Sequence, residues 1–358
     1  MAIARLALVT DAWAPQTNGV AITLKRVVQH LEANGVEVLV AAPDREQHRT
    51  VHLPSYPEIR IALDPWRAVE RICKFRPDAI HVATEGTLGF WAVAWLRRRG
   101  LRFTTSFHTR YPEYLTARVP WFKTEWGYNL VRWFHCRAEH TLVSTRSIVR
   151  DLRERRVGKR LVYWPRGVDT ELFSPSRRSL ECYAGLPRPI WAYVGRVAVE
   201  KSIEDFLALP LEGTKVVVGD GPAREELQRR FPDAVFRGYR YGVDLATHYA
   251  SADRFVFPSR TDTFGNVLLE ALASGLPVAS VPAPGPVDLV QDGVNGAIGD
   301  DLLLACQRAL RCSRDLARAS ILRRTLRAGH ELFRRHLVEA DPAREQLNRD
   351  EAAAVPYG

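Results

Sequence analysis

Short apolar runs alternate along the chain with longer charged segments in which apolar residues recur at helical spacing. A short apolar run between turn residues is typical of a strand buried on both faces, and the helix-period segment after it is typical of a crossover helix. The alternation therefore predicts an α/β fold with parallel sheets. The predicted strands are residues 4–9, 37–42, 79–82, 103–107 and 141–144 in the first half, and 190–194, 215–218, 234–237, 254–257 and 277–281 in the second.

A stretch without clear periodicity divides the chain into two similar halves. Residues 164–189 contain several prolines, and the alternation of strands and helices starts again after them. A chain of 358 residues also exceeds the size at which a single hydrophobic core keeps growing. We therefore predict two Rossmann-like, doubly wound domains that face a cleft, at residues 1–173 and 174–340, followed by a frayed tail at 341–358.

Charge and cysteine content narrow the functional classes. The 51 Lys and Arg residues exceed the 41 Asp and Glu residues by ten, which calls for an anionic partner: nucleic acid, an anionic membrane surface or a phosphorylated substrate. The five cysteines include no C-x-x-C pair, so a disulfide framework and a zinc site are disfavoured. No apolar run of about 18 residues occurs, and the first apolar segment leads to Asp11 rather than to a cleavage site. We expect a cytoplasmic protein without a membrane span.

Glycine turns follow the first predicted strand of each half, at Asn18-Gly19-Val20 and at Gly195-Arg196. Ligands of open parallel sheets bind beyond the carboxyl ends of the strands, so these turns lie where chemistry is expected. Neither turn fits the G-x-G-x-x-G pattern, and the chain has no Walker A sequence. A nicotinamide enzyme is therefore disfavoured.

Residues 258–277 combine a loop, the start of a helix and a Gly-Leu-Pro stop. We expect this helix to begin near Phe264, with Asp262 just ahead of it and Glu270 about two turns inside. One carboxylate would then be available to sugar hydroxyls and the other to a ribose diol. The alternative interpretation is that Asp262 only caps the helix and that Glu270 is a surface helix residue.

The beginning of this helix is also a candidate anion site. The backbone N–H groups of Phe264, Gly265 and Asn266 would point away from the helix without intrahelical partners, and the helix dipole favours negative charge there. A diphosphate group would fit this position.

Asp262 and Glu270 are separated by seven residues, with Phe-Gly between them and Leu-Glu-Ala-x-Ala-x-Gly-x-Pro around and after Glu270. This pattern resembles the E-x7-E signature of the family 4 retaining glycosyltransferases, with Asp in place of the commoner first Glu. The resemblance implies two domains of GT-B architecture and sugar transfer from a nucleoside-diphosphate donor with retention of anomeric configuration.

The segment 193–201 supports the same resemblance. Arg196 comes directly after a predicted strand and Lys201 follows five residues later, and the family carries an Arg and a Lys here to hold the donor diphosphate. The leaving nucleoside diphosphate gains negative charge as the glycosidic bond breaks. The chain has no Asp-x-Asp motif, so we expect two cationic side chains, and neither a metal nor another cofactor, to stabilise that charge. The alternative is a solvated basic face.

Further positions match the family one by one. Gly19 corresponds to the glycine loop whose backbone approaches the donor phosphate, and His108 to a histidine near the transferred sugar. The turns at 218–222 and 236–239 resemble those that line the base pocket, and 166–175 resembles the inter-domain segment. The candidate catalytic residues are His108, Arg196, Lys201 and Asp262, and the candidate donor-binding residues are Gly19, Gly195, Gly219, Asp220, Gly238, Phe264, Gly265, Asn266, Val267 and Glu270.

The resemblance also implies a mechanism in which the donor's own phosphate helps to deprotonate the acceptor hydroxyl. No carboxylate is identifiable as a covalent nucleophile, since Asp262 and Glu270 suit hydroxyl contacts better than a glycosidase pair. His108 would position the sugar rather than act as a general base. We expect the donor to bridge Gly19 of one domain and Arg196 of the other, with opening and closing of the cleft.

The acceptor is indicated by an aromatic and basic segment, residues 118–137, and by the three arginines at 97–99. Basic residues with aromatic anchors are typical of a protein that lies on an anionic membrane surface. The alternative interpretation is that the aromatic side chains fill the core between helices. The segments 56–60, 83–86 and 107–114 also resemble the bacterial subgroup that glycosylates diacylglycerol-type or phosphatidylinositol-type lipids. We predict a lipid acceptor and a peripheral position at the inner face of the plasma membrane, while GDP-mannose, UDP-glucose, UDP-glucuronate and UDP-sulfoquinovose stay open as donors.

Four other hypotheses compete with a glycosyltransferase that acts on a lipid. A soluble or polysaccharide acceptor would replace the lipid, and a sugar-nucleotide epimerase would perform no transfer. A nucleic-acid-binding protein is disfavoured because the charge is spread along amphipathic helices without a recognisable motif. The intact set of candidate residues argues against an inactive scaffold.

Overall fold

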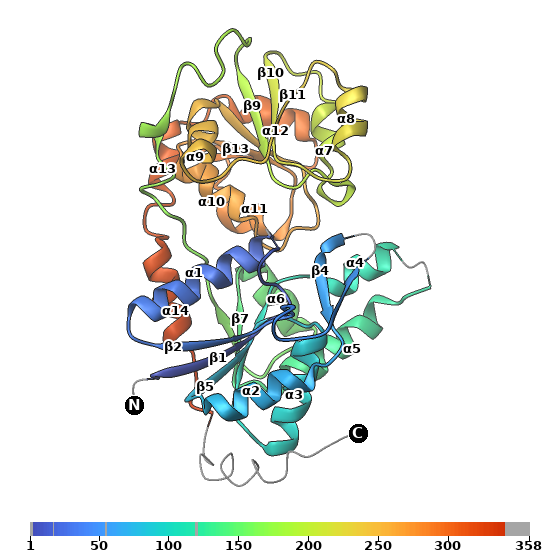
Figure 1. The fold of residues 1–358 in the computed structure, drawn as a ribbon. Coiled ribbons are helices and arrows are strands. Elements are labelled where there is room, and N and C mark those ends of the chain that lie inside the picture. The colour runs from blue at the N-terminus through green and yellow to red at the C-terminus, as the bar shows by residue number, and fades with distance from the viewer. Residues whose placement is uncertain (1–2, 17, 54–55, 119–120, 341–358) are drawn as a thin grey trace. The chain divides into compact units, whose positions relative to one another are not determined.

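The computed structural model describes residues 3–16, 18–53, 56–118 and 121–340 (Figure 1). The chain forms two compact units, one made of Met1–Pro165 with the chain from Gly329 onward, and the other of Arg166–Ala328. Each unit contains a six-stranded sheet whose neighbouring strands are parallel. The predicted fold class, two α/β domains with parallel sheets, is confirmed.

The first unit has the strand order β2-β1-β5-β6-β7-β8. An antiparallel pair, β3 with β4, is added outside this sheet. The strands are β1 Arg5–Val9, β2 Glu37–Ala41, β3 Thr50–Leu53, β4 Tyr56–Ala62, β5 Ala79–Val82, β6 Thr104–Phe107, β7 His140–Val143 and β8 Leu161–Tyr163. The helices are α1 Gly19–Ala33, α2 Trp66–Phe75, α3 Thr87–Arg99, α4 Tyr111–Arg118, α5 Thr124–His135 and α6 Arg146–Glu154.

Alternate residues of β1 face opposite layers of helices. Leu6 lies in a core with Val27 of α1, whereas Ala7 lies in a core with Ile72 of α2 and Val93 of α3. Since side chains on a strand alternate between its faces, a strand covered on both sides reads as a continuous apolar run. Figure 1 shows α1 on one side of this sheet and α2 and α3 on the other.

The second unit repeats the architecture with the strand order β11-β10-β9-β12-β13-β14. Every residue of its central strand, β9, is buried. The strands are β9 Ile190–Val194, β10 Thr214–Val218, β11 Val235–Gly238, β12 Arg254–Phe257, β13 Val278–Ser280 and β14 Gly296–Ile298. The helices are α7 Ile203–Leu207, α8 Arg224–Arg230, α9 Gly242–Ser251, α10 Asn266–Ala273, α11 Pro284–Leu289, α12 Leu302–Ala309 and α13 Arg314–Ala319, and α14 Leu326–Arg335 follows.

The sequence predicts that the first domain ends at residue 173 and the second at residue 340. In the structure the second unit instead begins at Arg166 and ends at Ala328. Residues from Arg166 belong to the second unit, where Val168 N donates to Arg324 O at 2.9 Å and Phe173 is buried in the core. From Gly329 the chain belongs to the first unit, where Phe333 of α14 packs in the same core as Leu6. Both differences come from packing between segments far apart in the sequence. The predicted frayed tail, 341–358, lies outside the described residues.

The ten predicted strands all occur, with ends shifted by no more than one residue. Three features were not predicted: the short strands β8 and β14, and the antiparallel pair β3–β4. A strand of three residues, such as β8, is too short to show a period of its own.

Candidate functional site

The loop after β9 carries Gly195 and Arg196 at the carboxyl end of the central strand. The Tyr193 hydroxyl donates to Arg196 O at 2.8 Å, and Val197 N donates to Asp220 O at 2.9 Å. These bonds fix the backbone of the loop to β9 and to the turn after β10. Arg196 is therefore held at the edge of the sheet where ligands of doubly wound folds bind.

Lys201 and Asp262, which are 61 residues apart in the sequence, form an ion pair in the second unit. Lys201 ends a short 3-10 turn, Val199–Lys201, and Asp262 lies in the loop between β12 and α10. A second bond ties the two loops together, because the Thr261 hydroxyl donates to Glu200 O at 3.1 Å. The structure thus brings together two of the predicted catalytic residues, and both side chains are mostly withdrawn from solvent.

The helix after this loop, α10, begins at Asn266 rather than near Phe264, where the sequence placed it. Gly265 is the residue before the helix and has a φ of 76°, a left-handed conformation that ends the preceding extended loop. No side chain caps this helix, so the alternative interpretation of Asp262 as an N-terminal cap is wrong. The Phe264 side chain is buried in the core and can contribute only its backbone to an anion site.

Glu270, the fifth residue of α10, accepts a hydrogen bond from the Tyr249 hydroxyl at 2.9 Å through Oε2. Burial raises the pKa of Tyr249 well above its ordinary value, so this hydroxyl keeps its proton and stays a donor. Glu270 is only partly buried. Tyr249 thereby orients one oxygen of the predicted ribose-binding carboxylate, and no sequence pattern had pointed to it.

Arg166 is a second residue that the candidate set lacked. It is buried beside the start of α10, with its guanidinium 5.2 Å from the centre of the Phe264 ring and Nη1 donating to Asn266 Oδ1 at 3.3 Å. Burial lowers its pKa to about 10, which leaves it cationic at neutral pH. Arg166 begins the segment 166–175, which the sequence analysis matched to the inter-domain segment of the family and not to the candidate site.

The turns after β10 and β11 meet at their glycines. Gly219 N donates to Gly238 O at 2.8 Å, and a Cβ at position 219 would lie 1.9 Å from Gly195 O. Asp220 uses both carboxylate oxygens within its own turn, with Gly221 N at 2.8 Å and Arg224 Nη1 at 2.5 Å. Because both oxygens of Asp220 are engaged within the protein, the residue would contribute to donor binding by fixing the shape of the turn.

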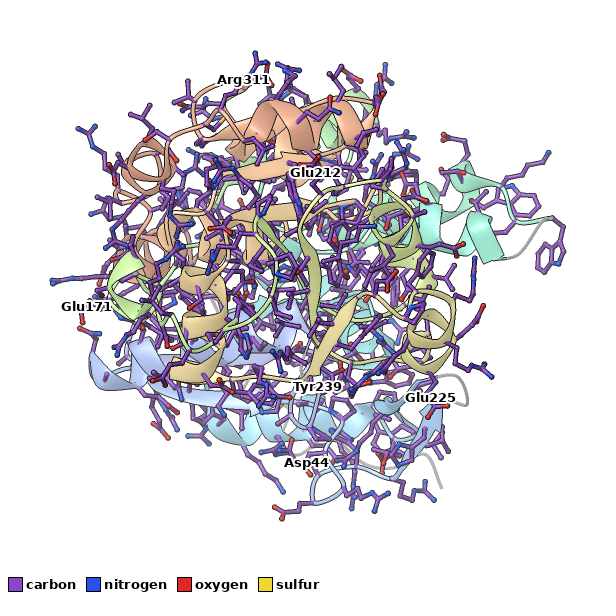
Figure 2. All side chains as sticks on the ribbon, turned by 90° about the horizontal axis from the view of Figure 1, so that it is seen from above. Asp44, Glu171, Glu212, Glu225, Tyr239 and Arg311 are labelled. Carbon is purple, nitrogen blue, oxygen red and sulfur yellow. The ribbon has the colours of Figure 1, made fainter. Side chains whose placement is uncertain are left out.

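Two exposed tyrosines follow β11. The Tyr239 and Tyr241 rings are stacked, with centroids 6.1 Å apart and planes 21° from parallel, and Figure 2 shows Tyr239 at the end of its strand. Stacked aromatic side chains at the carboxyl end of a strand offer a flat apolar surface to a planar ligand. Tyr239, the last residue of the turn at 236–239, contributes one of these two rings, and the base pocket expected at this turn stays a prediction.

In the first unit, Gly19 is the first residue of α1. Asn18 caps this helix, since its Oδ1 accepts from Val20 N at 3.0 Å and from Ala21 N at 2.9 Å. The two N–H groups after Gly19 are thus occupied by the cap. The approach of the Gly19 backbone to a donor phosphate stays a prediction.

His108 follows β6 and is buried, with Nε2 2.8 Å from the Ser106 hydroxyl. Its ring also meets Trp164 edge-on, at 6.0 Å between centroids. The same Ser106 hydroxyl lies 3.1 Å from Nε2 of His81, which is fully buried. These contacts orient the His108 ring, and its role in positioning the transferred sugar stays a prediction.

We expect the first unit to lose stability in mild acid because of His81. Burial, with a smaller effect of His135, lowers the pKa of His81 to about 3, whereas an unfolded histidine titrates near 6.5. The unfolded state binds the proton first, so the stabilisation is complete above pH ~6.5 and is lost as pH falls toward about 3, by up to ~1.4 kcal/mol per pH unit.

Urea unfolding of His81→Asn at pH 7 and pH 5 tests this expectation. The difference between the two midpoints should be smaller in His81→Asn than in the wild type, whatever the absolute stability of the variant. His52→Asn, at an exposed position, is the matched control and should keep the wild-type difference. An unchanged difference in His81→Asn would remove His81 as the source of the acid sensitivity.

Asp11, after β1, connects the loop that precedes α1 to the start of α3. Its carboxylate accepts from Leu88 N at 3.0 Å, from Gly89 N at 3.2 Å and from the Thr84 and Thr87 hydroxyls at 3.2 Å. Burial raises its pKa. Asp11 thus caps a helix that follows a different strand, a role that its sequence position could not indicate.

The aromatic segment 118–137 divides between core and surface. Phe134 is fully buried, whereas Trp121, Trp126 and Trp133 are exposed, so the core interpretation holds for only part of the segment.

Within the described ranges, no helix is long and apolar enough to cross a membrane. Nor do the described residues include a group of three or more His, Cys, Asp or Glu side chains placed to hold a metal ion.

Comparison with known proteins gives matches along most of the chain. A family model described as Glycosyltransferase Family 4 matches residues 17–172, and one described as Glycosyl transferases group 1 matches residues 188–312. A GDP-mannose-dependent alpha-mannosyltransferase of Mycobacterium tuberculosis is 34% identical over 80% of this chain and 81% of that protein. An alpha-monoglucosyldiacylglycerol synthase of Streptococcus pneumoniae is 27% identical over 82% of this chain and 75% of that protein.

Among solved structures, sucrose-phosphate synthase from Thermosynechococcus elongatus has a similar fold. It superposes with a TM-score of 0.76 and covers 98% of this chain and 100% of its own. The sequence identity is 21%, so this likeness concerns the fold alone.

Proposed function

The chain belongs to glycosyltransferase family 4, and we propose that it transfers a hexose-type sugar from a nucleoside-diphosphate sugar to a hydroxyl group of a membrane glycerolipid or glycolipid, with retention of configuration. The similar proteins named above include a GDP-mannose-dependent enzyme and a glucosyldiacylglycerol synthase, which supports a sugar nucleotide as donor and a lipid as acceptor. A mannose, glucose or glucuronate donor suits the proposal equally.

The observation that carries the proposal is the pairing of Lys201 with Asp262 beside the start of α10. As the bond between the sugar carbon and the phosphate oxygen breaks, the leaving diphosphate takes up the electron pair. Arg196 and Lys201 stabilise the charge that develops on it, and neither needs a metal ion or another cofactor to do so.

The remaining roles follow from the positions of the side chains. Asp262 accepts hydrogen bonds from sugar hydroxyls, and Glu270, oriented by Tyr249, accepts them from the ribose diol. The acceptor hydroxyl attacks on the side from which the diphosphate leaves, and its proton passes to a phosphate oxygen of the donor. His108, held by Ser106, positions the transferred sugar.

The other candidate donor residues act through the backbone. Gly195, Gly219 and Gly238 shape the turns that receive the nucleotide, and Asp220 fixes one of these turns through Arg224. The helix start formed by Phe264, Gly265, Asn266 and Val267 binds phosphate oxygens, and Gly19 leaves room for the donor phosphate in the first unit. The protein would work from the cytoplasm, bound peripherally to the inner face of the plasma membrane.

Incubation with a panel of UDP- and GDP-sugars and a bacterial lipid extract, with chelator present, tests the proposal. Mass spectrometry should find a glycolipid heavier than its precursor by one sugar residue. The mass of the precursor identifies the acceptor, and the sugar nucleotide whose separate incubation gives the product identifies the donor. Restoration of product only by an added divalent metal would overturn the metal-independent mechanism.

The other outcomes distinguish the alternatives. Binding of a donor without any change in the lipids would point to a soluble or polysaccharide acceptor. Conversion of the donor to an isomer, without transfer, would point to an epimerase. Binding of nucleic acid without affinity for any sugar nucleotide would contradict the glycosyltransferase assignment of these residues.

A further inference from the structure

Helix α14 comes from the end of the chain and packs on the sheet of the first unit. It lies beside α1 in Figure 1, and Nε2 of His30 in α1 is 3.3 Å from Oε1 of Glu331 in α14. Phe333 of α14 is fully buried in the core that also contains Leu6 of β1. Residues 326–335 lie outside the ranges that the two family models match, so the family comparison assigns this helix no function.

Trp164 connects α14 to the loop that follows β6. The Trp164 side chain is buried, and its indole N–H donates to the carbonyl oxygen of Gly329 in α14 at 2.9 Å. Between ring centroids, Trp164 lies 5.2 Å from Phe333 of the same helix and 6.0 Å, edge-on, from His108. A buried indole N–H needs a hydrogen-bond acceptor, and α14 supplies one from its backbone. The position of the Trp164 ring therefore depends on the position of α14.

The contacts of Trp164 close a ring of five side chains that includes His108. Phe333 meets the His81 ring edge-on at 4.8 Å between centroids, and Nε2 of His81 lies 3.1 Å from the Ser106 hydroxyl. The same hydroxyl lies 2.8 Å from Nε2 of His108. None of the five residues is more than 4% exposed. His108 is thus held by a hydroxyl on one side and by an aromatic ring on the other, and in a closely packed core it can turn only if these neighbours move.

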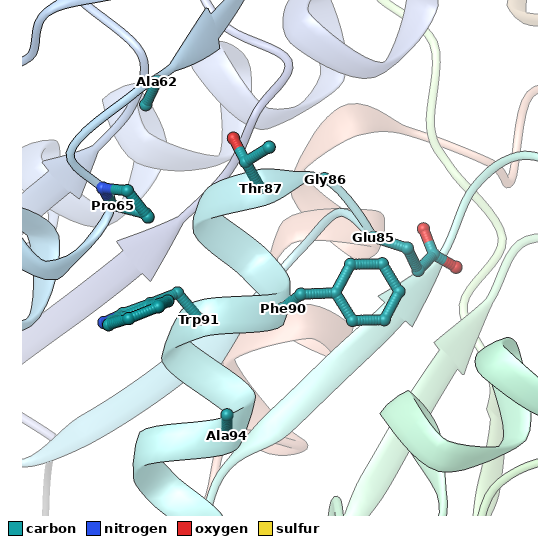
Figure 3. A pocket seen from close by; sticks show the side chains of 8 residues that line it. All are labelled: Ala62, Pro65, Glu85, Gly86, Thr87, Phe90, Trp91 and Ala94. Carbon is teal, nitrogen blue, oxygen red and sulfur yellow. The ribbon is translucent and has the colours of Figure 1, made fainter.

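The opposite face of β6 holds another buried histidine, His135, through other residues. Nδ1 of His135 lies 2.9 Å from the Thr105 hydroxyl, and Nε2 lies 3.0 Å from Oε1 of Glu85, which Figure 3 shows beside the Phe90 ring of α3. Since side chains alternate between the faces of a strand, Thr105 and Ser106 point into different helix layers. The layer that α14 covers is the one that contains Ser106, so a change in α14 should affect His108 and leave His135 in place.

We propose that Trp164 is a positioning residue of the transfer reaction: fixed by α14, it holds the His108 ring where that ring contacts the transferred sugar. This inference rests on the proposed function, which assigns His108 to the sugar. A small displacement of a positioned group lowers the rate strongly, because the reacting groups then leave the reactive geometry. Trp164 and α14 act through His108 and do not touch the donor.

Replacement of Trp164 tests the link from α14 to His108. Trp164→Leu removes the indole N–H and the aromatic ring, whereas Trp164→Phe removes the N–H and keeps an aromatic ring. We expect kcat to fall by roughly ten- to a hundredfold in Trp164→Leu and by less in Trp164→Phe. The affinities for UDP and GDP, measured by calorimetry, should stay at the wild-type values, because the predicted diphosphate residues Arg196 and Lys201 lie in the second unit.

Trp191→Phe is the matched control in the second unit. Trp191 is also buried, and its indole N–H donates to the carbonyl oxygen of Glu212 at 2.8 Å. This variant should lose stability in urea, as Trp164→Phe does, and keep the wild-type kcat. Equal losses of kcat in Trp164→Phe and Trp191→Phe would overturn the proposal, because a loss of stability alone would then explain both.

NMR of the histidine ring protons, recorded without donor, follows the position of His108 directly. Phe333→Leu removes an aromatic contact of Trp164 and leaves Trp164 itself in the chain. The His108 signals should shift in this variant and in Trp164→Leu, whereas the His135 signals should not. Unchanged His108 signals in both variants would overturn the proposal. A wild type that transfers no sugar would contradict the proposed function, and the ring signals would still decide whether Trp164 holds His108, so the two failures are distinguishable.

Discussion

Replacement of Lys201 by alanine should lower turnover by about two to three orders of magnitude, the effect typical of a group that stabilises charge developing on a leaving oxygen. The variant removes one of the two cations proposed to neutralise the diphosphate, and it leaves the Asp262 carboxylate without its ion-pair partner. The loop itself keeps the bond from the Thr261 hydroxyl to Glu200 O. The loss should therefore appear in kcat, measured with the donor found by mass spectrometry, far more than in the unfolding midpoint.

Lys159→Ala is the matched control for Lys201→Ala. Lys159 also pairs with a carboxylate, that of Glu139 at 3.1 Å, but it is 61% exposed and lies far from the candidate residues in the sequence. Its turnover should stay at the wild-type value. Wild-type turnover in Lys201→Ala as well would exclude the proposed role of Lys201 in charge stabilisation.

Replacement of Gly219 by alanine should lower the free energy of unfolding of the second unit by about 3 kcal/mol or more, through backbone strain and a clash that cannot relax cheaply. Gly219 has a φ of 140°, and its new Cβ would lie 1.9 Å from Gly195 O, a backbone atom in the neighbouring turn. Relief of the clash would move the loop that carries Arg196. We therefore expect a loss of nucleotide affinity together with the lower midpoint in urea unfolding.

Gly185→Ala separates strain from steric clash. Gly185 also has a positive φ, 76°, but a Cβ there would meet nothing within 4 Å. Only the conformational cost remains, about 1–2 kcal/mol, and nucleotide affinity should not change. Equal destabilisation by the two substitutions would show that the close approach of Gly219 to Gly195 does not constrain the fold.

The candidate site was predictable where residue type and local spacing carry the information. The Asp262 and Glu270 spacing, the Arg196 and Lys201 spacing and the glycine turns are local patterns. In the structure each pattern lies in the segment that follows a parallel strand, or in the first turns of the next helix. The start of α10 was missed by two residues because a glycine with positive φ delays it. A capping role for Asp262 was an ordinary expectation from sequence and fails because its carboxylate faces Lys201.

The partners of these residues could not be predicted, because they come from distant parts of the chain. Tyr249 lies 21 residues before Glu270 and shows no pattern of its own. Arg166 lies 100 residues before Asn266, and the pattern of its segment, 166–175, indicated a link between domains and not a contact with Asn266. Asp11 reaches α3 across 77 residues. Contacts of this kind depend on the order of strands in the sheets, which places segments side by side that the sequence separates.

The sequence by itself determined the α/β class, ten of the strands, the chemistry of the candidate donor residues and the excess of positive charge. Alternation of short apolar runs and amphipathic helices is sufficient for this, since both periods follow from backbone geometry. Only the tertiary structure decided where the two units divide, which aromatic side chains of 118–137 are buried and which carboxylate pairs with which cation. Burial and pairing are properties of the packed fold, because an apolar or charged residue acquires its environment only when distant segments close around it.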